Sequence, residues 1–209
     1  MMTDFKQNGM GEKATILLAH GAGAGMDSDF MVAWATGLAA RGFRALRFEF
    51  PYMVLRRGDG RKRPPDRAPK LMDAYRQAID DARMLTDGGK LVIGGKSMGG
   101  RIASMVAAED NNACEGLLLL GYPFHPTGKP EKLRTDHLGD ITVPTLIVQG
   151  ERDPFGGKAL VDTLSLPTGF TVHWAPDGNH DLSPRKASGH TSEKNWATAM
   201  DAAARDFAP

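Results

Sequence analysis

The sequence contains a single cysteine, Cys114, among 209 residues. One cysteine excludes an intramolecular disulfide framework and a cysteine-rich zinc site. It also favours a reducing compartment, so we expect a cytoplasmic protein. The first residues lack the apolar stretch of a secretory signal. No apolar run approaches the roughly 18 residues that a membrane-spanning helix needs, so we expect no membrane partner.

An excess of charge of one sign is also missing. The chain has 26 Lys and Arg residues against 25 Asp and Glu residues, a formal net charge of +1. Nucleic-acid-binding proteins usually carry a clear basic excess, so we expect no nucleic-acid partner. Hydrophobic residues make up 41% and charged residues 24%, as in ordinary globular domains. The length predicts one domain over residues 1–209.

Short apolar runs alternate with helical patterns along the chain. The runs that predict buried strands cover residues 14–20, 43–48, 91–95, 116–121, 145–150 and 170–175. Apolar residues spaced three and four apart predict helices, notably over residues 31–38, 71–85, 98–106 and 196–207. This alternation predicts an α/β fold, a minimal open parallel sheet of about six strands with helices on both faces. Ligands of such sheets bind beyond the carboxyl ends of the strands.

A G-x-S-x-G motif follows the third predicted strand and opens a helix. Its residues are Gly95, Lys96, Ser97, Met98 and Gly99. In this context the motif predicts a nucleophile elbow, in which a strained strand-to-helix turn lifts the serine hydroxyl above the sheet. The glycines leave room for neighbouring backbone. The N–H of the residue after the serine can donate to a developing oxyanion.

A serine nucleophile needs a base and an acid that orients the base. In enzymes with this elbow they follow the serine in the order acid, then histidine. Asp153 follows the fifth strand and His180 follows the last one, so we predict them as acid and base. Glu151 is the competing acid. His20 precedes the serine, in the wrong order, and we expect it to shape its own loop.

A small-residue loop, H-G-A-G-A-G, ends the first predicted strand at residues 20–25. Its N–H groups can approach an oxyanion closely, and we predict a second oxyanion donor at Ala22 or, next, at Gly23. A dinucleotide-binding loop is the rival interpretation, with Glu49 in place of the ribose-binding acid. That interpretation leaves Ser97 and His180 without a role.

These motifs together resemble the α/β-hydrolase superfamily over nearly the whole chain. The segments H-G-A-G-A-G, F-P-Y-M, G-G-K-S-M-G-G-R and L-G-Y-P-F-H-P are similar to the small lid-less group of dienelactone-hydrolase-like and KANSL-type predicted hydrolases. The resemblance implies an α/β-hydrolase fold with Ser97 as nucleophile, Asp153 as acid and His180 as base. Dienelactone hydrolases use a cysteine where Ser97 stands. Residues 121–144 are too few for a cap domain, which predicts an open site.

Substrate contacts are predicted from residues beside the elbow and in the loop after the four-leucine strand, at Lys96, Tyr122 and His125. Residues 56–70 hold seven basic and two acidic side chains, a local charge of +5. This segment could attract an anionic substrate. The alternative, which we favour, is a solvated loop that pairs with surface carboxylates.

The sequence therefore predicts a serine hydrolase that cleaves small esters or thioesters through an acyl-enzyme. No metal and no cofactor is needed for this chemistry. The alternative is a non-catalytic binding module on a hydrolase scaffold. We expect a monomer or a homodimer, the latter through the exposed sheet edge at the last strand.

Overall fold

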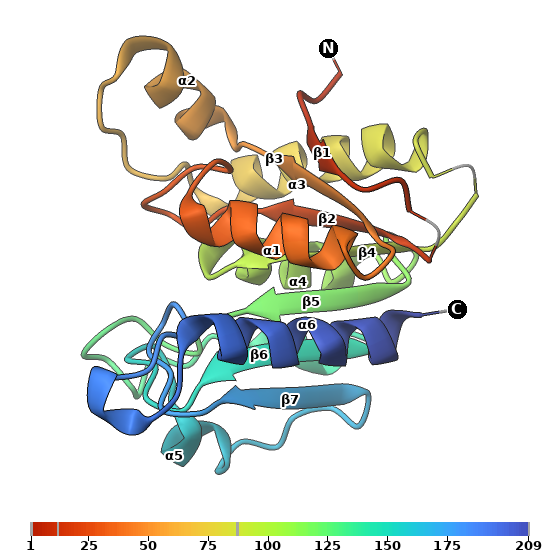
Figure 1. Cartoon of the computed structure of the whole chain (residues 1–209). Helices are drawn as coiled ribbons and strands as arrows, with labels where there is room; N and C mark the ends of the chain where they lie inside the picture. Colours follow the sequence, from red (N-terminus) through yellow and green to blue (C-terminus); the bar gives the residue numbers. More distant parts are fainter. Residues whose placement is uncertain (1, 12, 87, 209) are drawn as a thin grey trace.

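The computed structural model describes residues 2–11, 13–86 and 88–208. Its centre is a seven-stranded sheet in the order β1-β3-β2-β4-β5-β6-β7 (Figure 1). Every neighbouring pair is parallel except β1 with β3. The strands are β1 (Lys6–Asn8), β2 (Thr15–Ala19), β3 (Arg44–Phe48), β4 (Leu91–Lys96), β5 (Gly116–Leu120), β6 (Thr145–Gly150) and β7 (Phe170–Ala175).

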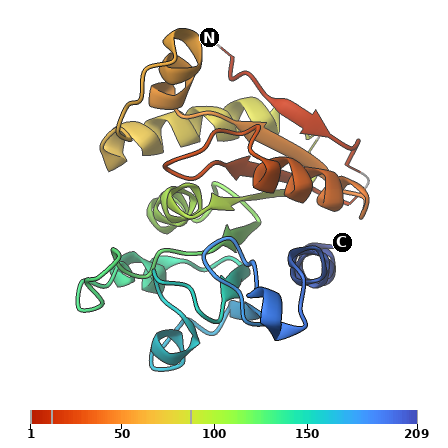
Figure 2. The ribbon, with the colours of Figure 1, turned by 60° about the vertical axis from the view of Figure 1, so that its left-hand side comes forward.

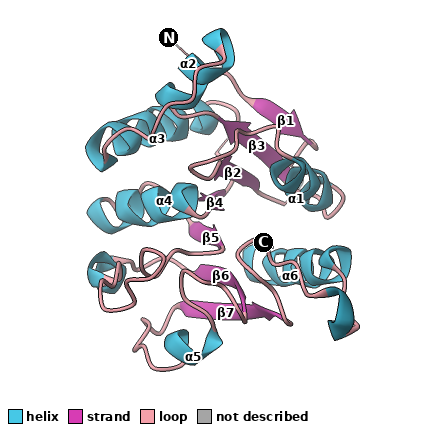
Figure 3. Ribbon diagram, turned by 90° about the vertical axis from the view of Figure 1, so that its left-hand side faces the viewer, coloured by secondary structure: helices cyan, strands magenta, loops and turns pink. Residues whose placement is uncertain are grey.

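Helices cover both faces of the sheet. On one face lie α3 (Ala68–Arg83) and α4 (Met98–Glu109), and on the other lie α1 (Asp29–Ala39) and α6 (Ser192–Phe207) (Figure 3). Figure 2 looks nearly along α4 and α6, with the sheet between them. The shorter α2 (Pro51–Asp59) and α5 (Lys158–Val161) follow β3 and β6. The predicted α/β-hydrolase architecture is therefore confirmed.

Side-chain alternation within the buried strands builds a core on each face. In β5, Leu117 and Leu119 pack with residues of α3 and α4, whereas Leu118 and Leu120 pack with residues of α1 and α6. A strand buried on both faces needs apolar residues at every position, which is why β5 contains four consecutive leucines. Cys114 lies just before β5 in the first core, where burial raises the pKa of its thiol to about 11.

Two elements differ from the sequence-based prediction. The sheet has seven strands, because the polar β1 adds to β3 in antiparallel orientation. Residues 51–59, where no helix was predicted, form helix α2. Proline is favourable at the first position of a helix, where its missing N–H would have no partner. Tyr52 and Met53 are buried and anchor this helix.

No domain is inserted between β5 and β6. Residues 121–144 contain one short 3₁₀ helix, η1 (Asp136–Asp140), so the prediction of a fold without a cap is confirmed. Within the described ranges, every helix is too short or too polar to cross a bilayer. The parallel strands end on one side of the molecule, at the left of Figure 1, and the predicted site residues follow those ends.

Candidate active site

Ser97 stands at the junction of β4 and α4 in a strained conformation. Its φ is 52° and its ψ is −113°, an unusual region for a residue with a side chain. The turn is held by the Ser97 N–H, which donates to the carbonyl oxygen of Leu120 at 2.8 Å. Backbone strain of this kind is characteristic of functional sites. The predicted elbow geometry is present at this serine.

The glycines around Ser97 permit close contact between backbones. A Cβ at Gly95, whose φ is 153°, would lie 2.2 Å from the carbonyl oxygen of Ala19. A Cβ at Gly99 would lie 2.4 Å from the same oxygen. Real Cβ atoms do not approach oxygen so closely. The motif needs its two glycines because α4 and the end of β4 pack directly on β2.

His180 links Ser97 to Asp153. Its Nε2 atom lies 2.9 Å from Ser97 Oγ, and its Nδ1 atom lies 2.8 Å from Asp153 Oδ2. The imidazole can therefore donate from Nδ1 to the carboxylate and accept from the serine hydroxyl at Nε2. The histidine side chain is 21% exposed and the aspartate side chain is fully buried. The structure brings together the three residues that the sequence selected.

The Asp153 carboxylate is fixed by further donors. The Phe155 N–H donates to Oδ1 at 2.8 Å, and Gln149 Nε2 donates to Oδ2 at 3.1 Å. Gln149 is fully buried in β6 and also bonds both the N–H and the carbonyl of Tyr122. Sequence analysis missed Gln149, although a glutamine in an apolar strand is a signal. The Gln149 side-chain amide therefore connects the loop that carries Asp153 to the loop that follows β5.

The competing acid lies elsewhere. The Glu151 carboxylate accepts from the backbone N–H of Asp177 at 2.8 Å, on the turn that precedes His180. Asp177 in turn forms ion pairs with Arg152 and Arg185. Glu151 therefore shapes the histidine turn, and the geometry favours Asp153 over Glu151 as the group that orients His180.

Lys96 is buried beneath the histidine turn. Its Nζ donates to the carbonyl oxygen of His180 and lies 3.3 Å from Asp181 Oδ1. Burial lowers the pKa of this ammonium below its ordinary value, and the Asp181 carboxylate partly opposes the effect. Lys96 was predicted to contact substrate, and that role stays a prediction. Its contacts here support the backbone that carries His180.

Two backbone segments beside Ser97 can supply oxyanion donors. Met98 is the first residue of α4, and N–H groups in a first helical turn have no acceptor within the helix. A Cβ at Gly21 would lie 3.9 Å from Ser97 Cβ, so the loop after β2 runs beside the elbow. The next N–H groups belong to Ala22 and Gly23. The helix dipole favours negative charge at this place.

The segment after β3 holds this loop from the other side. His20 is buried, and its Nδ1 lies 2.7 Å from the carbonyl oxygen of Gly21, while its Nε2 accepts from the Phe50 N–H at 3.1 Å. Burial lowers the pKa of His20, which agrees with a neutral ring that donates once and accepts once. Tyr52 Oη donates to the carbonyl oxygen of Ala22 at 3.0 Å.

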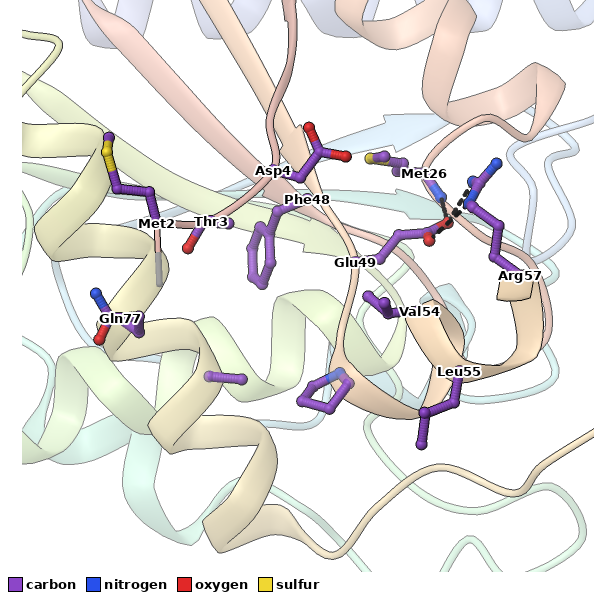
Figure 4. A pocket seen from close by; sticks show the side chains of 12 residues that line it. Met2, Thr3, Asp4, Met26, Phe48, Glu49, Val54, Leu55, Arg57 and Gln77 are labelled. Atoms are coloured by element: carbon purple, nitrogen blue, oxygen red, sulfur yellow. Dashed lines mark hydrogen bonds and ion pairs between the residues drawn. The ribbon is translucent and has the colours of Figure 1, made fainter. Parts of the chain in front are cut away.

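An ion pair between Glu49 and Arg57 also helps to attach the loop after β2 to the segment after β3 (Figure 4). The buried Glu49 carboxylate accepts from the Met26 N–H at 3.2 Å and pairs with Arg57 of α2 at 2.6 Å. Although burial opposes it, the hydrogen bonds from Arg57 and Met26 hold the pKa of Glu49 below its usual value. Glu49 is therefore engaged within the protein, which disfavours the dinucleotide interpretation. Beside it lies an apolar cavity of about 600 Å³ between α2, α3 and residues 2–4.

The two other predicted substrate contacts lie in the loop after β5. Tyr122 is fully buried against Phe124, and its hydroxyl donates to the Arg134 carbonyl oxygen at 2.8 Å. His125 is also buried, with Nδ1 2.8 Å from the carbonyl oxygen of Pro126. Both side chains serve the packing of the loop in this structure, and their contact with substrate stays a prediction.

Carboxylates neutralise part of the basic segment at residues 56–70. Arg57 pairs with Asp27 and Glu49, Arg63 pairs with Asp59, and Lys70 pairs with Asp66. This pairing agrees with the favoured interpretation of a solvated, locally neutralised loop. In the part of the chain that the structure describes, no group of three His, Cys, Asp or Glu residues could hold a metal ion.

Comparison with known proteins agrees with this fold. Residues 12–208 match the model of a family described as an alpha/beta hydrolase domain. Among solved structures, Est1E of Butyrivibrio proteoclasticus with bound ferulic acid is 17% identical, covers 97% of this chain and 94% of its own, and has a TM-score of 0.74.

Two further structures have similar folds. A dienelactone hydrolase of Anabaena variabilis is 23% identical, with 97% of this chain and 90% of that chain covered and a TM-score of 0.74. XC6422 of Xanthomonas campestris, an α/β serine hydrolase without a lid, is 20% identical, with 99% and 89% covered and a TM-score of 0.70. At these identities the likeness concerns the fold.

Proposed function

The chain belongs to the alpha/beta hydrolase domain family, and from this premise we propose that it is a serine hydrolase that cleaves small esters or thioesters. The observation that carries the proposal is the hydrogen-bonded series from Ser97 through His180 to Asp153, at 2.9 and 2.8 Å. Fold alone would not support an activity, because one fold hosts many functions. A nucleophile, a base and an orienting acid in mutual contact do support one.

In the proposed reaction, His180 Nε2 takes the Ser97 proton as Oγ attacks the substrate carbonyl carbon. Asp153 keeps the Nδ1 proton of His180 in place and stabilises the positive imidazolium. When the tetrahedral intermediate collapses, the protonated His180 gives its proton to the leaving alkoxide or thiolate. A water molecule then attacks the acyl-enzyme by the same route, which releases the acid and restores the Ser97 hydroxyl.

The Met98 N–H and the N–H of Ala22 or Gly23 would bind the oxyanion. Such donors are effective because they are already oriented before charge develops. Support comes from the contacts that fix their segments, namely α4 behind Met98 and the Tyr52 hydrogen bond to the Ala22 carbonyl. Hydrolysis by this route needs no metal ion.

A small substrate is favoured because no cap covers the strand ends. The segment between β5 and β6 contains only η1, and Est1E, which is similar in fold, has been solved with ferulic acid bound. These observations favour a compact acyl group and do not distinguish an ester from a thioester. Competition between matched oxygen and sulfur esters of one acyl group would make that distinction.

Labelling with a fluorophosphonate probe tests the proposed nucleophile. Intact-mass spectrometry should find one adduct on the wild-type protein, peptide mapping should place it on Ser97, and Ser97→Ala should remove it. The same variant should lower the rate of ester hydrolysis by several orders of magnitude. A folded wild-type sample that takes no label and hydrolyses no ester would contradict the proposal and favour a non-catalytic binding module.

A further inference from the structure

The apolar cavity of about 600 Å³ beside Glu49 lies apart from the candidate active site (Figure 4). The pairing of β1 with β3 extends to Arg47, and the cavity begins at the next residue, Phe48. Its other walls come from the N-terminal segment, α2 and α3, through Met2, Pro51, Val54, Leu55 and Ala74. In the part of the chain that the structure describes, none of the lining residues is a proposed catalytic residue.

Apolar side chains around this cavity are exposed to water. Met2, Val54 and Leu55 are 63%, 54% and 55% exposed. Exposed apolar residues that gather in one place mark a binding surface. Small organic ligands occupy concave sites of about 300–1,000 Å³, so the size and shape of this cavity favour a small molecule.

The polar groups of the cavity leave little to recognise a charge. Glu49 pairs with Arg57 at 2.6 Å, and Gln77 donates to Asp81 at 3.1 Å. Asp4 is exposed, and an ion pair in water contributes little free energy. An ionised ligand would therefore lose more hydration than these groups could replace, so an uncharged apolar ligand is favoured.

Helix α2 lies between this cavity and the loop after β2. The Val54 side chain lines the cavity, whereas the Tyr52 hydroxyl donates to the Ala22 carbonyl oxygen at 3.0 Å. One helical turn later, the Arg56 guanidinium donates to the Gly23 carbonyl oxygen at 3.1 Å. A ligand that packs against the cavity face of α2 would therefore hold the other face against the loop that carries a proposed oxyanion donor.

We propose that this cavity binds an uncharged apolar molecule, and that the bound ligand raises the kcat of ester hydrolysis by holding α2 against the loop after β2. The effect on kcat rests on the proposed function, whereas the binding site does not depend on it. A ligand that binds the packed position of α2 more tightly shifts the population toward that position. Oxyanion donors act on the transition state, so kcat changes and KM does not.

N-phenyl-1-naphthylamine is a suitable probe, because it is uncharged and fluoresces strongly only in apolar surroundings. Fluorescence titration of the wild type should show saturable binding of one molecule per chain. Ala74→Phe fills the cavity and Leu55→Asp places a charge on its wall, so each should weaken binding about tenfold or more. Val32→Asp is the matched control, because Val32 is 39% exposed on α1, and it should bind the probe as the wild type does.

Hydrolysis of 4-nitrophenyl acetate tests the effect on catalysis. A saturating concentration of the probe should raise the kcat of the wild type about fivefold, at the lower end of typical coupling between two sites, with KM unchanged. Tyr52→Phe should bind the probe as tightly as the wild type but show no rise in kcat, because it lacks the hydroxyl that contacts the loop. The Val32→Asp control should show the full rise.

The outcomes separate the inference from the proposed function. If the folded protein hydrolyses no ester but binds the probe, and Ala74→Phe or Leu55→Asp weakens that binding, the hydrolase proposal fails and the site stands. The thermal midpoint checks folding, and either variant is decisive if the other fails to fold.

Three results would overturn the inference. The first is probe binding that both cavity variants leave unchanged. The second is an active wild type whose kcat stays constant at saturation with the probe. The third is a dimer in sedimentation velocity that Leu55→Asp dissociates, which would assign the exposed apolar residues to contact with a second copy of the chain.

Discussion

The Tyr52 hydroxyl lies 3.0 Å from the carbonyl oxygen of Ala22 and 3.4 Å from that of Gly21. These two carbonyls belong to the peptide units whose N–H groups are those of Gly23 and Ala22. One phenol therefore orients both candidate donors of the second oxyanion position, although it lies on α2 and outside the loop.

Tyr52→Phe should consequently lower kcat with little change in KM. The loss should be about tenfold, below the 10²–10³-fold effect of deleting an oxyanion donor itself, because the donors remain but are less firmly oriented. Steady-state kinetics on a neutral ester, with the thermal midpoint as a folding check, measures this. A rise in KM at constant kcat would instead mean that Tyr52 acts in substrate binding.

Asp153 and Glu151 offer a second, paired test. Asp153→Asn should reduce kcat by about 10³–10⁴-fold, because an amide cannot hold the required tautomer of His180 or stabilise its charge. Glu151→Gln removes a carboxylate that bonds the Asp177 N–H, so its effect should stay within about tenfold. Equal losses for the two variants would contradict the assignment of Asp153 as the acid.

Glycine substitutions test the packing of the elbow. Gly99→Ala places a Cβ 2.4 Å from the Ala19 carbonyl oxygen, and the free energy of unfolding should fall by about 2–4 kcal/mol. Gly23→Ala is the matched control, because no atom lies within 4 Å of the position that its Cβ would take, and its effect should be within about 0.5 kcal/mol. Urea denaturation measures both values. Similar losses for the two variants would refute the close backbone contact described for Gly99.

His20 predicts a pH dependence of stability. Its pKa is lowered by burial from the ordinary 6.5, so the unfolded chain takes up a proton before the folded protein does. Its contribution is fully present above pH 6.5 and is lost as the pH falls from 6.5 toward the lower folded-state pKa. Urea denaturation at pH 7 and pH 5.5 should show a smaller decrease for His20→Gln than for the wild type. An unchanged decrease would assign the effect to His137 and His173, whose pKa values burial also lowers.

The sequence predicted every strand whose residues are all buried, namely β2, β4, β5 and β6. The four leucines of β5 can be recognised in the sequence because every position of this strand is buried and must be apolar. The glycines beside Ser97 can be recognised because a Cβ at either position would clash with neighbouring backbone. The strand β1 gave no such signal. It has three polar residues, and its pairing with β3 depends on a tertiary contact that no local pattern records.

The same limit applied to the site. The order of Ser97, Asp153 and His180 along the chain was enough to select them, because parallel strands end at one edge. The support from Tyr52 and Gln149 could not be predicted in this way. Their partners lie 30 and 27 residues away, and the contacts exist only after β3, β5 and β6 are in register.

The burial of Cys114 has a practical consequence. It is the only thiol in the chain, and its pKa near 11 leaves it almost entirely protonated at neutral pH. A cysteine introduced on the surface, for example in the loop after β5, would therefore be the single reactive thiol of the molecule. Fluorophores and spin labels could be attached there to the otherwise native sequence, so the surroundings of the candidate active site can be probed without removing the native cysteine.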